Sequence, residues 1–189
     1  MITELHTNRL YLRQMKETDA ADLFQVWSDP EVARFMNISP FTAEQQAVEM
    51  IRMLADLAQK KQAIRFSIME KESGTIMGSC GYNYLDFEQA RAEIGYDLAR
   101  AFWGNGYAAE AVSALLDCGF TSLALNRIEA KVDPRNVNSI RLLEKLGFTR
   151  EGLLRAYERE GTGAEAGTGS SGSGDAFNDL YMYSRLASD

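Results

Sequence analysis

Apolar residues along the chain recur at two different spacings, and each spacing predicts one kind of element. Spacings of three and four residues place side chains on one face of a helix, whereas strict alternation places them on one face of a strand. The first pattern predicts four helices, at residues 18–29, 42–54, 108–123 and 138–146. The second predicts seven strands, at residues 9–15, 64–68, 76–84, 92–98, 127–132, 153–157 and 177–184.

Capping residues set the expected ends of these helices. Thr18 is expected to cap the first helix, which ends before Pro30, because proline disfavours a helical residue in front of it. Thr42 and Gln45 are predicted to form a capping box at the start of the second helix. Gly147 is expected to adopt a left-handed conformation at the end of the last helix.

The order of the elements predicts a mixed α/β sheet in a single domain spanning residues 1–189. The strand at 92–98, the helix at 108–123 and the strand at 127–132 form one right-handed parallel crossover, while the neighbouring strands are antiparallel. This order does not fit a doubly wound sheet. Residues 161–174 consist of Gly, Ser, Thr, Ala and Glu, the composition of a flexible insertion, and are left out of the fold prediction.

Composition narrows the class of partner. The net charge of -7 argues against nucleic acid or an anionic membrane as the main partner, and no apolar run is long enough to span a bilayer. The N-terminal residues do not resemble a signal peptide, so a cytoplasmic location is expected. Cys80 and Cys118 have no metal-binding spacing, and His6, the only histidine, is expected to be exposed ahead of the first strand. We therefore expect no metal site and no histidine-based triad.

A glycine-rich turn before the third predicted helix has the features of a phosphate-binding site. Gly104 and Gly106 let a ligand approach the backbone, and the amides of the first helical turn have no intrahelical acceptors. A tight turn that needs glycine for its own φ angles would have the same sequence. Residues 104–109 also satisfy the G-x-G-x-x-A pattern of dinucleotide-dependent oxidoreductases. The loop between Leu98 and Gly104 and the single parallel crossover argue against that class.

Four further motifs follow one another in a fixed order: Ala92-Glu93-Ile94-Gly95-Tyr96, the segment from Trp103 to Ala111, Asn136-Val137-Asn138-Ser139 and Leu146-Gly147-Phe148. Together they resemble the GNAT acyltransferases, and more narrowly the branch that acetylates ribosomal-protein N-termini. The resemblance spans nearly the whole chain apart from residues 161–174. It implies the GNAT fold, with the sheet splayed between the fourth and fifth predicted strands, and acetyl-CoA as co-substrate.

The resemblance also implies a coenzyme site. Backbone amides from Trp103 through Ala108 would bind the pyrophosphate, the strand at residues 94–98 would pair with the pantetheine arm, and Asn138 would bind the pantetheine amides. Arg100, Arg135, Arg141 and Lys145 are available to neutralise phosphates. The residues assigned to the coenzyme are Ile94, Tyr96, Leu98, Trp103, Gly104, Asn105, Gly106, Tyr107, Ala108, Asn138, Arg141 and Lys145.

Acetyl transfer to an amine needs a group that accepts the amine proton and a group that protonates the leaving thiolate. The resemblance implies that Glu93 is the base, acting directly or through water, although a solvent-facing strand position would also hold a glutamate. Leu143 replaces the tyrosine that many family members use as the acid. Ser139 is therefore the expected proton donor, with simple helix capping as the alternative. Direct attack is expected, with the oxyanion held by a backbone amide near Ile94 or Tyr96.

The acceptor is expected to be a primary amine, with a protein N-terminal α-amine favoured by the resemblance. Small amines, polyamines and aminoglycosides, and a non-catalytic acyl-CoA-binding module, are the alternatives. The first two helices and the final hairpin are expected to form the acceptor wall. Four acidic residues would then line the approach of a cationic amine: Glu44, Glu49, Asp86 and Glu88. The chain is expected to act as a monomer or homodimer.

Overall fold

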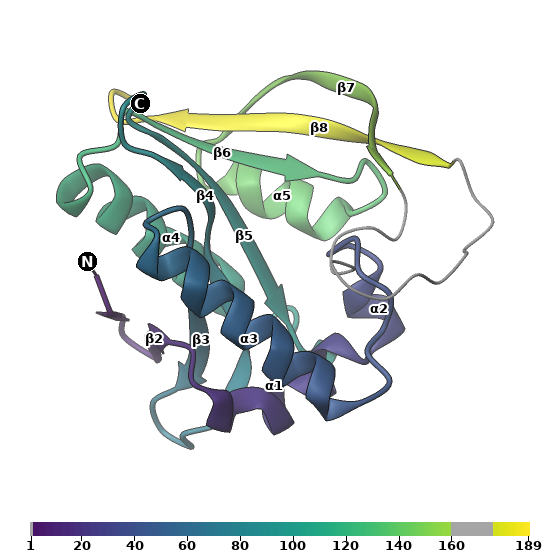
Figure 1. Cartoon of the computed structure of the whole chain (residues 1–189). Helices are drawn as coiled ribbons and strands as arrows, with labels where there is room; N and C mark the ends of the chain where they lie inside the picture. Colours follow the sequence, from purple (N-terminus) through teal and green to yellow (C-terminus); the bar gives the residue numbers. More distant parts are fainter. Residues whose placement is uncertain (1, 160–175) are drawn as a thin grey trace.

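A computed structural model describes residues 2–159 and 176–189, and within these the strands form one mixed sheet of eight members (Figure 1). The predicted insertion at 161–174 lies outside the described residues. In spatial order the strands are β1 (Glu4–His6), β2 (Leu10–Gln14), β3 (Ile64–Glu70), β4 (Ile76–Asp86), β5 (Arg91–Leu98), β6 (Arg127–Val132), β8 (Phe177–Leu186) and β7 (Thr149–Arg159). Neighbours are antiparallel except β5 and β6, which are parallel. The predicted mixed sheet with one parallel crossover is confirmed.

The parallel pairing between β5 and β6 is short. It joins Arg91 to Arg127, Ala92 to Ile128 and Glu93 to Glu129, and then stops. Beyond that point β5 continues to Leu98 paired with β4 alone, and β6 continues to Val132 paired with β8 (Figure 1). The backbone groups of β5 that face β6 therefore lack a strand partner after Glu93. This confirms the predicted splay of the sheet.

Helices cover both faces of the sheet. α1 (Ala20–Trp27), α2 (Pro30–Ala33) and α3 (Glu44–Gln59) share one apolar cluster with Met15 and Phe41. α4 (Tyr107–Asp117) and α5 (Val137–Lys145) pack in a second cluster with the inward residues of the strands. Side chains alternate along β5, so Ile94 and Leu98 enter the second cluster while Asp97 accepts a hydrogen bond from Trp27 of α1. Successive residues of β5 therefore address opposite faces of the sheet.

Two element counts differ from the prediction. His6 lies in β1 rather than ahead of the first strand, and it is exposed. This strand has three residues, of which Leu5 alone is apolar, so alternation could not reveal it. Among the described residues there are five α-helices rather than four, because Pro30 begins α2 instead of merely ending α1. Proline suits the first helical position, where its missing N–H is not needed.

Helix caps also differ in detail. Thr18 lies within a 3₁₀ turn, Glu17–Asp19, and Asp19 is the N-cap of α1. At α3 the side chain of Gln46, not Gln45, reaches back, and its Oε1 accepts from the N–H groups of Thr42 at 2.7 Å and Ala43 at 3.1 Å. The N-cap of α3 is therefore Ala43 rather than Thr42, and both predicted caps are wrong by one residue. Gly147 has φ +79°, which confirms the left-handed C-cap of α5.

Three further observations concern membrane helices, metal-binding groups and the two cysteines. No helix in residues 2–159 or 176–189 has the length and apolar character needed to cross a bilayer. In the same residues no group of three or more His, Cys, Asp or Glu side chains is placed to hold a metal ion. Cys80 and Cys118 are buried and unbridged, and burial raises the pKa of the Cys80 thiol to about 12. That thiol is a poor nucleophile near neutral pH.

Candidate functional site

A cleft of about 810 Å³ passes through the sheet where β5 and β6 diverge. Both faces of β5 contribute to it, with Glu93 and Asp97 on the side of α1 and α3, and Ile94, Tyr96 and Leu98 on the side of α4 and α5. Of the residues predicted for the site, all except Asn105 line this cleft. The structure thus brings together side chains from β5, α5 and the turn before α4. Their individual roles stay predictions.

The turn before α4 offers a cluster of open amides. Gly104 has φ +77° and Gly106 has φ +79°, so both glycines are required by the backbone conformation. Gly106 is the N-cap of α4. Within the described part of the chain, the amides of residues 104–109 donate to no acceptor. A turn that only reversed the chain would not need so many open donors, and their convergence at a helix N-terminus suits an anion.

Three residues of this turn have partners inside the protein. Trp103 Nε1 donates to the Leu98 carbonyl at 2.7 Å, so that carbonyl already accepts one hydrogen bond from within the protein. Asn105 Nδ2 donates to the Trp103 carbonyl at 3.1 Å, which turns its side chain to the loop itself. The Tyr107 hydroxyl donates to Glu70 Oε1 at 2.6 Å. These side chains therefore hold the shape of the turn and leave its backbone amides as the groups available to a ligand.

The four basic candidates divide into two pairs. Arg100 is bound to Asp29 at 2.6 Å, and Arg135 is bound to Asp133 at 2.5 Å. Arg141 and Lys145 line the cleft from α5, and within residues 2–159 and 176–189 neither forms an ion pair. These two cations are therefore the better placed to meet phosphate groups.

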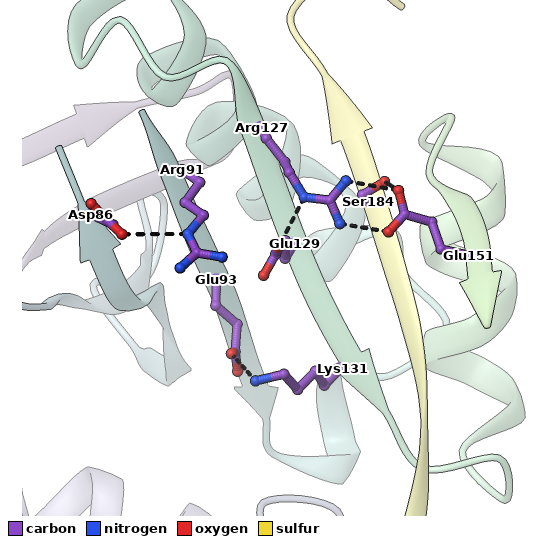
Figure 2. A network of polar contacts seen from close by, with 8 residues as sticks. All are labelled: Asp86, Arg91, Glu93, Arg127, Glu129, Lys131, Glu151 and Ser184. Atoms are coloured by element: carbon purple, nitrogen blue, oxygen red, sulfur yellow. Dashed lines mark hydrogen bonds and ion pairs between the residues drawn. The ribbon is translucent and has the colours of Figure 1, made fainter. Parts of the chain in front are cut away.

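Glu93 faces the α1–α3 side and is held by a lysine that the sequence analysis did not single out. Lys131 Nζ lies 2.7 Å from Glu93 Oε2 (Figure 2). The same Nζ lies 4.9 Å from the centre of the Tyr157 ring. Burial alone would lower the pKa of Lys131, but its hydrogen bonds to Glu93 and Tyr157 outweigh burial and raise it. Lys131 therefore stays charged and fixes the Glu93 carboxylate at the point where the strands separate.

The other charges around Glu93 are paired among themselves (Figure 2). Arg127 binds Glu129 at 2.6 Å and Glu151 at 2.6 Å, and Ser184 donates to Glu151 at 2.7 Å. The hydrogen bonds from Arg127 and Ser184 lower the pKa of Glu151 to about 2. Although Glu129 lies opposite Glu93 in the register, its charge is already balanced. Lys131 is thus the cation that serves Glu93.

Ser139 lies on the opposite side of β5, beside Tyr96. The N-cap of α5 is Asn136, whose Oδ1 accepts from the Ser139 N–H at 3.2 Å, so the Ser139 hydroxyl is not the capping group. The Tyr96 hydroxyl is buried and has no hydrogen-bond partner among the described residues. Burial raises the pKa of Tyr96 to about 12, and the neighbouring Ser139 hydroxyl opposes the rise. Leu143 is buried next to the cleft and supplies no proton.

The far end of the cleft is lined by α2, α3, β7 and β8, with α1 contributing Trp27. The acceptor wall was predicted from the first two helices and the final hairpin, and that role stays a prediction. None of the four acidic residues predicted for the approach lines it. Glu44 and Glu49 lie on the exposed side of α3, and Asp86 and Glu88 lie at the hairpin between β4 and β5. The acidic residues that do line the cleft are Glu31, Glu93, Asp97, Asp133 and Glu158. These five residues come from separate elements of the chain, so no local sequence pattern could have identified them as a group.

Comparison with known proteins assigns this arrangement to a family. Residues 9–149 match the model of the acetyltransferase (GNAT) domain. The uncharacterized N-acetyltransferase p20 of Bacillus licheniformis is 58% identical, over 82% of this chain and 87% of its own length. The uncharacterized N-acetyltransferase YoaA of Bacillus subtilis is 40% identical, over 83% of this chain and 89% of its own length. A GNAT-family acetyltransferase from Bacillus anthracis superimposes with a TM-score of 0.83 at 23% identity, covering 99% of this chain and 100% of its own. The chain therefore belongs to the GNAT family and is an acetyl-CoA-dependent N-acetyltransferase.

Proposed function

We propose that this N-acetyltransferase moves the acetyl group of acetyl-CoA directly onto the α-amino group at the N-terminus of a protein. The observation that carries the proposal is the shared cleft, in which the open amides of residues 104–109 meet the unpaired edge of β5. The first feature suits a diphosphate and the second suits an amide-containing arm added like a strand. A coenzyme bound in this way has its thioester beside Glu93.

In the proposed mechanism, the two proton transfers take place on opposite faces of β5. The amine attacks the acetyl carbonyl from the side of Glu93, the new C–N bond forms, and the amine proton passes to the Glu93 carboxylate directly or through water. A backbone amide near Ile94 or Tyr96 binds the oxyanion. The C–S bond then breaks, and Ser139 donates a proton to the thiolate on the α5 side. Solvent restores both groups, so that acetyl-CoA and amine become N-acetyl amine and free thiol.

The charges on the acceptor side favour a single amine over a polycation. Of the five acidic residues lining the cleft, Glu31, Glu93, Asp97 and Asp133 are ion-paired with Arg34, Lys131, Arg65 and Arg135. Glu158 has no ion pair within the described residues. Burial, together with the nearby Glu93 charge, raises its pKa. A polyamine or aminoglycoside carries several ammonium groups and requires several free carboxylates, which this wall does not offer. An α-amine also loses its proton more readily than a lysine side chain, since its pKa is about 8 rather than about 10.4.

The names of similar proteins supply candidate acceptors for the test. A structure described as a ribosomal-protein-S5-alanine acetyltransferase from Vibrio fischeri superimposes with a TM-score of 0.77 at 22% identity, a likeness of fold alone. The spermidine N(1)-acetyltransferase of Escherichia coli is 30% identical over 76% of this chain. Both acceptor classes therefore occur on this fold, and the pairing of charges in the cleft is our reason for preferring the first.

Release of free thiol from acetyl-CoA, measured against a panel of acceptors, tests the proposal. The panel contains peptides with a free N-terminus, the same peptides with a blocked N-terminus and a free lysine, spermidine and an aminoglycoside. We expect turnover with the free N-termini and background rates with the blocked peptides. Turnover with spermidine or the aminoglycoside alone would refute the proposed acceptor, and coenzyme A binding without turnover on any acceptor would indicate a binding module. The same mixtures without enzyme measure uncatalysed acetylation.

A further inference from the structure

The segment just before β2 is clamped onto the first turn of α4. Glu110 Oε1 accepts from the Thr7 hydroxyl at 2.6 Å and from the Arg9 N–H at 2.7 Å, and Glu110 Oε2 accepts from Arg9 Nε at 2.7 Å. The Glu110 side chain is 18% exposed. Burial would raise its pKa, but the bonds from Thr7 and Arg9 outweigh burial and lower it. The carboxylate is therefore charged and fully engaged.

Arg9 continues from this clamp to the glycine turn. Its Nη1 donates to the Asn105 carbonyl at 3.0 Å, and its Nη2 lies 3.5 Å from where a Cβ on Gly106 would be. Its guanidinium stacks 4.3 Å from the centre of the Tyr107 ring, whose hydroxyl is anchored to Glu70 of β3. The Arg9 side chain thus contacts residues 105 and 107 of the turn, lies beside residue 106, and links the turn to the sheet.

Two physical consequences follow from these contacts. The turn contains two glycines, which have the largest backbone freedom in the unliganded chain, so open amides converge on an anion only if another group fixes the turn. A carboxylate at position 110 would also repel phosphate from the start of α4, and the ion pair with Arg9 offsets that repulsion. Arg9 therefore both restrains the glycine turn and balances the charge of Glu110.

We propose that Arg9 is a positioning residue for the coenzyme, which fixes the turn at residues 104–107 in the conformation that accepts the diphosphate. The inference rests on the proposed function, since it assumes that this turn binds the diphosphate of acetyl-CoA. The inference adds Arg9, which lies far from the turn in sequence, to the proposed coenzyme site. Its guanidinium contacts the turn and Glu110 rather than the reacting atoms.

The test compares a coenzyme that has the diphosphate with one that lacks it. The kcat/KM ratio of acetyl-CoA to acetyl-pantetheine, and the Kd of coenzyme A by calorimetry, are measured for the wild type, Arg9→Met and Arg9→Lys. Arg13→Met is the matched control, because Arg13 is on β2 and forms a partly buried pair with Asp19 at 2.7 Å, away from the turn. Because Arg9→Met loses a charged hydrogen bond to the turn, we expect it to weaken coenzyme A binding. The ratio of kcat/KM for acetyl-CoA to that for acetyl-pantetheine should fall by about tenfold or more. Arg9→Lys keeps the charge but lacks the planar guanidinium, so its kcat/KM ratio is expected to lie between those of the wild type and Arg9→Met.

Each outcome decides between alternatives. An unchanged ratio in folded Arg9→Met would overturn the inference, and full restoration by Arg9→Lys would show that charge alone is needed and overturn the positioning role. If Arg9→Met does not fold, Arg9→Lys carries the test. An equal fall in the ratio in Arg13→Met would mean that general destabilisation explains the effect. Failure of the wild type to bind coenzyme A would refute the proposed function itself, which the Arg9 variants cannot do.

Discussion

Glu93, the last residue of β5 that pairs with β6, forms an ion pair of 2.7 Å with Lys131, two residues beyond that pairing on β6 (Figure 2). Both side chains are about one-fifth exposed, at 21% and 20%, so the pair is less screened by water than a surface pair. The proposed base thus has a defined orientation before any substrate arrives. An incoming amine meets a carboxylate that is already held at the fork of the sheet.

Glu93→Gln is expected to lower kcat by about 100-fold or more, because it removes the acceptor of the amine proton while preserving size. The Kd of coenzyme A should be unchanged, since the amides of residues 104–109 are untouched. Glu129→Gln is the matched control, because Glu129 lies opposite Glu93 but binds Arg127 and does not line the cleft. Full activity of Glu93→Gln at saturating substrate would exclude a carboxylate base.

Ser139→Ala separates catalysis from capping. We expect kcat to fall by about 100-fold, the range typical of a lost general acid, while the free energy of unfolding changes by less than about 0.5 kcal/mol. Asn136→Ala, which removes the side chain that caps α5, should instead cost about 1 kcal/mol of stability. Denaturant unfolding and steady-state rates check both variants. The idea fails if Ser139→Ala is as active as the wild type.

Tyr96→Phe is expected to stabilise the protein. The Tyr96 hydroxyl is buried without a partner among the described residues, and such a group costs about 1–3 kcal/mol. Its removal leaves the ring in place and should raise the free energy of unfolding by about 1 kcal/mol. Thermal or urea unfolding would show this, with Tyr84→Phe as control, since that side chain is 48% exposed. A loss of stability would mean that the hydroxyl has a partner in solution.

Periodicity predicted the sheet well because each long strand buries one face. Ile128, Ala130 and Val132 alternate and are all buried, and the splay was implied by the resemblance and then found in the register after Glu93. The short elements β1 and α2 were not predicted, because they contain too few residues to show a periodic pattern. The N-caps fall at Asp19 and Ala43, each one residue later than predicted, and the local sequence does not distinguish these neighbouring positions.

The site was less predictable, because its contacts depend on how distant segments meet. Motifs identified the turn, Glu93 and Ser139, each of which lies within a recognisable pattern. Lys131 and Arg9 have no local signal: one is a polar residue in an alternating strand, and the other precedes the first long strand by one position. Charge counting likewise failed for Glu44 and Asp86, since pairing and position in space decide which carboxylates reach the cleft.

The contacts of Glu151 on β7 with Arg127 on β6 and Ser184 on β8 should make part of the protein's stability sensitive to acid. Arg127, helped by Ser184, lowers the pKa of Glu151 from 4.5 to about 2. A depressed pKa means that the folded state binds the proton less readily than the unfolded state, so the contribution is complete above pH 4.5 and is lost as the pH falls toward 2. Urea unfolding of wild type and Glu151→Gln should therefore give a stability difference that is constant above about pH 5 and shrinks below it.

Because the Glu151 side chain is 41% exposed, added salt should reduce that difference. Glu88→Gln alters an exposed residue without an ion pair in the described chain and should follow the wild type at every pH. A difference between wild type and Glu151→Gln that does not narrow as the pH falls would show that the carboxylate charge is not the source.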